Sequence, residues 1–181
     1  VERGTGNRAH GLLAERAGQI TGWLPLSEVH SPVFGRMLAS SGFAVDGGPL
    51  GDNAGLLCRT AEELALRLSC PSIELRGGDA PADWTMRTDS HCGFVCDLAA
   101  DDEAQLLAIP RKQRAEVRRG LGYDMQVSIG RAEEDRAAHY AVYAASVRNL
   151  GTPVFPRGLF DAVLDNLDAD ILTVRREGVA L

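Results

Sequence analysis

One short stretch, residues 146–157 (SVRNLGTPVFPR), combines side chains that could hold a polar ligand. Arg148 can pair with a carboxylate or a phosphate, and Asn149 and Thr152 can form hydrogen bonds with polar groups. Phe155 can stack on a ring. The residue types therefore indicate a substrate-binding loop.

Turn chemistry gives a second explanation of the same stretch. Gly151 suits the end of one helix, Pro153 and Pro156 prevent its continuation, and Val154 and Phe155 would fill a core. Both explanations stay open at the level of the sequence.

A second candidate site is the basic run 111–119 (RKQRAEVRR). On a helix, Arg111, Arg114 and Arg118 share a face, and Lys112 adds a fourth cation. Such a run is either the solvated face of a linking helix or an anion site for a diphosphate or a tRNA backbone. Screening limits the reach of such a patch to roughly 10 Å. No aromatic residue is interleaved with the cations, so base-specific reading of RNA is not expected.

The stretch SHCGFVCD (90–97) is the one cluster suggesting thiol or metal chemistry. His91, Cys92 and Cys96 do not have the spacing of a zinc half-site, and no second pair follows. If 93–98 forms a strand, Cys92 and Cys96 share a face and are small core residues. We expect no metal site.

Composition limits the classes of protein that the chain can belong to. Of its 181 residues, 45% are hydrophobic and 24% charged, as in soluble globular proteins. The net charge of −6 argues against a DNA-binding protein. No apolar run reaches the roughly 20 residues of a membrane span, and we expect a cytoplasmic protein with reduced cysteines.

Hydrophobic periodicity and turn residues predict alternating strands and helices. The expected elements are a strand-turn-strand over 10–30 with its turn at Ala17–Gly18, a helix ending near Leu68, strands at 72–77 and 93–98, a helix from Pro110 to about Gly120, a strand in 123–129, an amphipathic helix over 133–148, a helix over 157–167 and a strand-turn-strand over 170–181. From residue 123 onward the order is β-α-α-β-β.

The end of the chain resembles its beginning at a constant offset of 160 residues. Ala9, Leu12, Arg16 and Gly18 match Ala169, Leu172, Arg176 and Gly178. Hairpins share turn chemistry whatever their ancestry, so coincidence and duplication of one module both remain open.

Four stretches carry a family resemblance: LLAERAGQITGWLPLSEVHSPVFGRML, IPRKQRAEVRRGL, YAASVRNLGTPVFPRGLFDAVL and DILTVRREG. They cover nearly the whole chain, and SVRNLGTPVFPR is the most specific. The chain resembles the FemAB-related proteins of the exosortase/PEP-CTERM type, which have tandem GNAT-like acyltransferase modules. The resemblance implies an α/β (α+β) fold with a first module in 1–100 that lacks its N-terminal part, linking helices in 101–122 and the start of a second module in 123–181.

That resemblance also implies a function. It implies transfer of an acyl or aminoacyl group to an amine of a small-molecule or lipid-linked precursor of the cell envelope or of an exopolysaccharide. The donor would be acyl-CoA or aminoacyl-tRNA, and the bacterial protein would work in the cytoplasm, including the inner face of the membrane. In GNAT-like domains the loop between the first two helices borders the acceptor cleft, which would place Arg148, Asn149, Thr152 and Phe155 there.

A donor site is not evident in the sequence. GNAT enzymes cradle the pyrophosphate of acyl-CoA on a Q/R-x-x-G-x-G/A loop that opens a helix. RREGVA (175–180) fits the pattern but lies in the predicted hairpin, so we interpret it as a chance match. Because the chain begins at Val1 and ends in REGVAL, we expect a piece of a longer protein, without a cofactor and inactive alone. No catalytic residue can be named.

Two alternatives to a transferase follow from the same residues. The chain could be a non-catalytic GNAT-like module that binds a glycan or lipid-linked precursor, or a structural half-domain.

Overall fold

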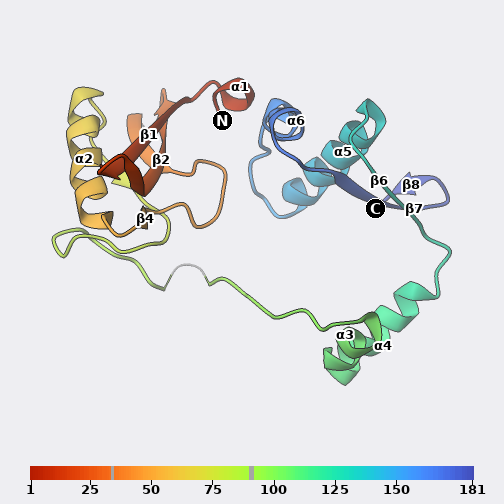
Figure 1. Ribbon diagram of the computed structural model, residues 1–181. Coiled ribbons are helices and arrows are strands. Elements are labelled where there is room, and N and C mark those ends of the chain that lie inside the picture. The colour runs from red at the N-terminus through yellow and green to blue at the C-terminus, as the bar shows by residue number, and fades with distance from the viewer. Residues whose placement is uncertain (34, 90–91) are drawn as a thin grey trace. The chain divides into compact units, whose positions relative to one another are not determined.

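The computed structural model describes residues 1–33, 35–89 and 92–181 (Figure 1). The chain forms two compact units. The first comprises Val1–Arg87 with Pro156–Asp165, and the second comprises Thr88–Phe155 with Asn166–Leu181. Sheets and helices are present in both, which confirms the mixed α/β class. The division into GNAT-like modules at 1–100, 101–122 and 123–181 stays a prediction.

The first unit is built on a mainly antiparallel sheet of order β1-β2-β3-β5, with β4 paired to β2. Strands β3 and β5 pair in parallel. The elements are α1 (Glu2–Thr5), β1 (Arg8–Arg16), β2 (Gln19–Ser31), β3 (Gly35–Ser40), β4 (Leu50–Gly51), α2 (Ala54–Arg67), β5 (Ile73–Glu74) and nearly all of α6 (Arg157–Asn166).

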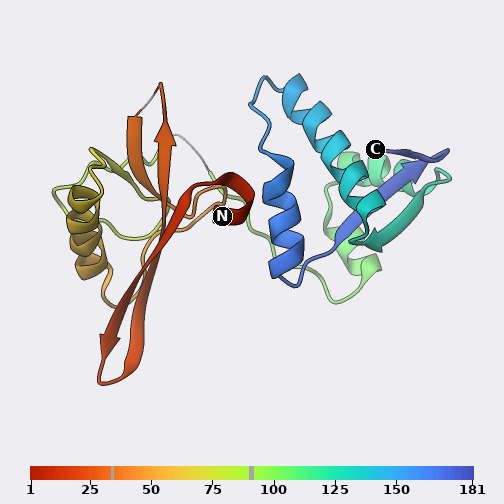
Figure 2. The same ribbon diagram turned by 90° about the horizontal axis from the view of Figure 1, so that it is seen from above.

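The predicted first hairpin is confirmed (Figure 2). Strands β1 and β2 pair from Arg16↔Gln19 outward, with one irregularity after Ala14. Both turn residues have positive φ, 51° at Ala17 and 78° at Gly18. This backbone suits a two-residue turn because its twist matches that of the strands.

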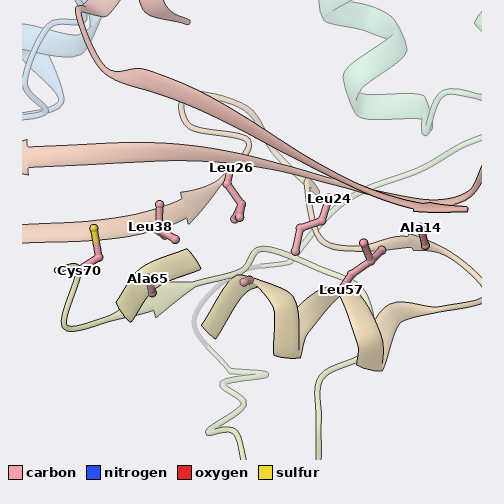
Figure 3. Close-up of a cluster of buried hydrophobic side chains, with 8 residues drawn as sticks. Ala14, Leu24, Leu26, Leu38, Leu57, Ala65 and Cys70 are labelled. Atoms are coloured by element: carbon pink, nitrogen blue, oxygen red, sulfur yellow. The ribbon is translucent and has the colours of Figure 1, made fainter. Parts of the chain in front are cut away.

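The core of the first unit lies between the sheet and α2 (Figure 3). Alternation along β1 and β2 turns Ala14, Leu24 and Leu26 to the helix. Helical spacing brings Leu57, Ala61 and Ala65 of α2 to the same layer. The cluster is closed by Leu38 and Cys70.

The second unit contains a three-stranded antiparallel sheet of order β6-β7-β8. Its elements are α3 (Asp102–Ala108), α4 (Arg111–Leu121), β6 (Gln126–Gly130), α5 (Glu133–Asn149), β7 (Ile171–Arg176) and β8 (Val179–Ala180). With α6, the order from β6 to β8 is the predicted β-α-α-β-β. The last hairpin repeats the turn of the first, with φ of 53° at Glu177 and 80° at Gly178.

The strand predicted over 93–98 was wrong. This segment has no regular secondary structure, and Phe94 and Val95 are 92% and 98% exposed. Short apolar runs become strands only where another strand supplies hydrogen bonds, and none pairs with these residues in the described part of the chain. Cys92 and Cys96 are accordingly exposed rather than buried in a core, and His91 lies outside the described residues.

Within the described residues, no helix combines the length and the apolar character that a membrane crossing requires.

Candidate functional site

The loop that follows α5 is drawn in Figure 1. It begins with a helix cap made by backbone hydrogen bonds. The amide N–H of Gly151 donates to the carbonyl of Arg148 (3.1 Å), and the amide N–H of Thr152 donates to the carbonyl of Val147 (2.9 Å). Gly151 has a φ of 71°, as the left-handed residue of this motif requires. The predicted role of Gly151 is confirmed, and the backbone of Thr152 belongs to the cap as well.

The start of α5 is also stabilised by its own residues. The Asp135 carboxylate accepts a hydrogen bond from the amide N–H of Ala132 (3.1 Å). Glu133 and Glu134 add negative charge to the first turn, and Arg148 adds positive charge to the last. Both placements of charge stabilise α5 through their interaction with the helix dipole.

Two expectations about burial here were wrong. None of the residues of α5 is buried, so the helix does not have the expected core-facing side. Val154 and Phe155 do not fill a core either, since they are 41% and 38% exposed. The alanines of α5 therefore lie on a partly exposed side of the helix and are not packed in a core.

Two tyrosine hydroxyls of α5 form hydrogen bonds with the backbone carbonyl and the backbone N–H of Phe155. The Tyr140 hydroxyl donates to the Phe155 carbonyl (3.0 Å), and the Phe155 amide N–H donates to the Tyr143 hydroxyl (3.2 Å). The Tyr143 and Phe155 rings lie 6.4 Å apart, and the His139 ring stacks on Tyr143 at the same distance. We call Tyr140 and Tyr143 the tyrosine clamp; it fixes the loop to the helix.

The expectation of an amphipathic helix over 133–148 did not predict this clamp, because helical periodicity does not show which loop atoms a tyrosine hydroxyl contacts. The available signal was two tyrosines three residues apart on a helix that leads into a proline-containing loop.

A depression of about 490 Å³ lies between the last turns of α5 and this loop. It is lined by Ala141, Ala144, Ala145, Arg148, Thr152, Pro153 and Val154. Positions 141, 144, 145 and 148 form one stripe at helical spacing, which explains why they share a wall. All its walls lie within the second unit.

The structure brings together two of the four residues predicted for the substrate loop. Arg148 and Thr152 line the depression. Asn149 is exposed and Phe155 is held by the tyrosine clamp, and neither belongs to the lining. Among the described residues, Arg148 forms no ion pair, so its charge is available to a ligand.

The basic residues predicted as an anion site lie on α4. Arg114 donates to the carbonyls of Leu107 (2.7 Å) and Ile109 (2.9 Å), so its guanidinium joins α4 to the end of α3. Arg111, Lys112 and Arg118 are exposed on the helix. Their role as an anion site stays a prediction.

No group of three or more potential metal-binding side chains occurs in 1–33, 35–89 and 92–181. The other two cysteines, Cys58 and Cys70, are buried in the first unit, where desolvation raises the pKa of both thiols. A raised pKa keeps them protonated and unreactive.

A second depression, of about 370 Å³, lies on the first unit at the sheet face around Gly11 and Trp23. The Trp23 ring covers Gly11, where any Cβ would collide with it. The nearby side chains of His10 and Glu28 approach to 3.4 Å. This surface is mainly apolar and lacks an arginine.

Comparison with protein-family models gives no match, and comparison with curated proteins gives none either. The solved structures that resemble the chain include a ribosomal-protein-alanine N-acetyltransferase from Brucella melitensis biovar Abortus 2308. The alignment covers 44% of this chain and 69% of that one, with 18% sequence identity and a TM-score of 0.33.

Proposed function

We propose that the chain carries the acceptor site of an N-acyl- or aminoacyltransferase of the FemAB-like, GNAT-related kind. The acceptor would be an amine on a precursor of the cell envelope or of an exopolysaccharide, free or lipid-linked. The donor would be acyl-CoA or aminoacyl-tRNA, and the reaction would take place in the cytoplasm, including the inner face of the membrane.

The observation that carries the proposal is the depression at Arg148 and Thr152. It lies beside the connection between α5 and α6, the two helices of the β-α-α-β-β order. The family resemblance implies that the acceptor cleft is bordered by this connection. The tyrosine clamp supports it, because a binding loop must be held in place before the ligand arrives.

In the proposed reaction, the acceptor amine attacks the carbonyl carbon of the donor ester or thioester. A C–N bond forms, the C–S or C–O bond breaks, and the nitrogen gives up one proton to solvent or to a base. The leaving group takes up a proton and departs as the free thiol of CoA or the terminal hydroxyl of the tRNA. Such a reaction gains most of its rate from positioning and from polarisation of the carbonyl. Arg148 and Thr152 would supply positioning, and we assign no residue to proton transfer.

The proposal is tested by mass spectrometry of the acceptor. The chain, alone and within any longer protein that contains it, is incubated with a UDP-linked muramyl peptide carrying a free amine and with acetyl-CoA or charged tRNA. We expect the acceptor to gain the mass of the donor's acyl group only where a donor site accompanies this chain, because no donor-binding loop is evident in residues 1–181. Binding of the acceptor without any mass gain from either donor would contradict transfer and favour the non-catalytic binding module.

A further inference from the structure

The depression at Arg148 has a single charge and otherwise apolar walls. Three alanines of α5 and the loop residues Pro153 and Val154 supply its apolar lining. Arg148 is the only charged residue among those that line it, and Thr152 is the only one with a side-chain hydroxyl. A ligand that fits this lining would therefore combine one anionic group with an apolar group.

The Arg148 guanidinium forms no ion pair with a carboxylate within the described residues. Arg131 shows the contrast, since its guanidinium meets Asp170 (3.1 Å) and Asp168 (3.5 Å). Arg148 has no carboxylate partner of this kind in the same unit. Its planar guanidinium can donate two parallel hydrogen bonds to a carboxylate, and the Thr152 hydroxyl offers a further donor.

The number of cations favours a carboxylate over a phosphate. A diphosphate carries more negative charge than one arginine balances, and its strongly hydrated oxygens would lose water against alanine, proline and valine. A carboxylate bears one charge, and its aliphatic substituent gains free energy from the apolar walls.

From these features we propose that the depression binds a carboxylate bearing a short aliphatic substituent, with Arg148 on the carboxylate and Ala141, Ala144 and Ala145 against the aliphatic group. As part of the acceptor, this group would be a carboxyl terminus or carboxylated side branch next to the amine. That assignment rests on the proposed function, whereas carboxylate binding itself does not.

The test is an NMR titration of the chain at low salt with acetate, propionate and butyrate. We expect the amide signals of Arg148 and Thr152 to shift, and the affinity to rise up to about fourfold for each added methylene. Butyramide, which has the same shape without the charge, should bind at least tenfold more weakly.

Two variants separate the charge from the apolar wall. Arg148→Met keeps the length of the side chain and should reduce butyrate affinity at least tenfold. Ala145→Leu keeps Arg148 and fills the depression from an exposed position, so acetate should be affected less than butyrate. Arg16→Met, at an exposed arginine of the first unit, is the matched control and should leave the titration unchanged.

Equal binding of butyrate and butyramide, stronger binding of methyl phosphate, or an unchanged titration in Arg148→Met would overturn this inference. Its fate is separable from that of the proposed function. Carboxylate binding without any acyl transfer would support the inference and contradict the transferase, and transfer without carboxylate binding would overturn the inference alone.

Discussion

Gly51 lies at a position of the first unit where a side chain would be strained. Its φ is +91°, and a Cβ added there would collide with the carbonyl oxygen of Thr21 on the paired strand. Gly55 follows four residues later on α2, where a Cβ would meet nothing within 4 Å. A side chain is therefore excluded at Gly51 and has room at Gly55.

We predict that Gly51→Ala lowers the free energy of unfolding by about 2 kcal/mol, because backbone strain adds to the collision. Gly55→Ala should raise it by about 0.5 kcal/mol, since alanine is the better helix former. Urea denaturation of both variants checks this. An unchanged midpoint for Gly51→Ala would show that β4 does not pair with β2 as described.

Arg148 is the residue on which the proposed site depends. It is exposed and lacks an ion pair among the described residues, so replacing it removes no salt bridge that the structure shows and only the small stabilisation from its charge at the C-terminus of α5. Stability and binding should therefore separate at this position. A residue that only capped the helix would behave in the opposite way.

At the level of elements, a polar strap joins α2 to the segment after β5. Arg59 contacts Glu62 (2.9 Å) and Asp83 (2.7 Å), and the Trp84 indole N–H donates to Glu62 (2.8 Å). The Arg59 guanidinium holds the pKa of Asp83 below its usual range, and Arg59 and then the Trp84 indole do the same for Glu62. The same partners raise the pKa of Arg59.

This strap should open in acid. Because the folded pKa of each carboxyl is depressed, the stabilisation is present above the unfolded pKa and is lost as the pH falls through the folded value. We predict that Trp84 emission in a Trp23→Phe background stays constant from pH 7 to about 4 and moves to longer wavelength below that.

In the same background, Arg59→Gln should give red-shifted Trp84 emission already at pH 7. If wild type and Arg59→Gln had the same emission at every pH, the strap would not hold Trp84 in solution.

The tyrosine clamp makes a separate prediction for the loop after α5. Tyr143→Phe removes the acceptor for the Phe155 amide and keeps the ring against the Phe155 ring. Hydrogen exchange at the Phe155 amide should accelerate about fivefold to tenfold, the effect of losing about 1 kcal/mol. The amide of Thr152, which bonds to Val147, should keep its rate and is the internal control.

Exchange at Phe155 that does not change in Tyr143→Phe would mean that the hydroxyl does not hold the loop.

Sequence patterns predicted the turns and helix ends best, because local residue types determine their backbone conformation. The positive φ values at Ala17–Gly18 and Glu177–Gly178, and the cap at Gly151, follow from turn and cap residues. The errors concern burial. The segment 93–98 has strand composition without a partner strand, and α5 has helical periodicity without a buried face. Partners and burial depend on distant parts of the chain, which local patterns do not report.

The candidate site was predictable in part for the same reason. Arg148 and Thr152 were predicted because a guanidinium and a hydroxyl are groups that bind polar ligands. The tyrosine clamp depends on which side of α5 faces the loop, and the sequence does not show this. The alanines were not predicted as part of a site because an alanine side chain has no functional group. The proposed carboxylate preference depends on these alanines lining the same depression as Arg148, which the sequence does not show.

At the scale of the whole molecule, the two units differ in how much they bury. The first unit has a cluster of eight buried residues between its sheet and α2. In the described part of the second unit, only Ile171 and Thr173 are buried, and the Thr173 hydroxyl has no hydrogen-bond partner there. Buried apolar area is the main source of stability, so the units should not be equally stable.

We predict that amides of β6 and β7 exchange at least tenfold faster than amides of β2 and β3 under native conditions, because low burial permits local opening. Hydrogen exchange resolved by residue checks this within one sample. Equal protection of the two sheets would contradict this prediction, because it would show that the second unit is as stable as the first although it buries fewer residues.

The most direct measurement of the central claim is a calorimetric titration of the chain with a UDP-linked muramyl peptide, for wild type, Arg148→Ala and the control Arg16→Ala. We predict binding by wild type and control, at least tenfold weaker binding by Arg148→Ala, and melting temperatures within about 2 °C of one another. Unchanged binding in Arg148→Ala, particularly with a sharply lowered melting temperature, would contradict the account and make Arg148 a structural residue.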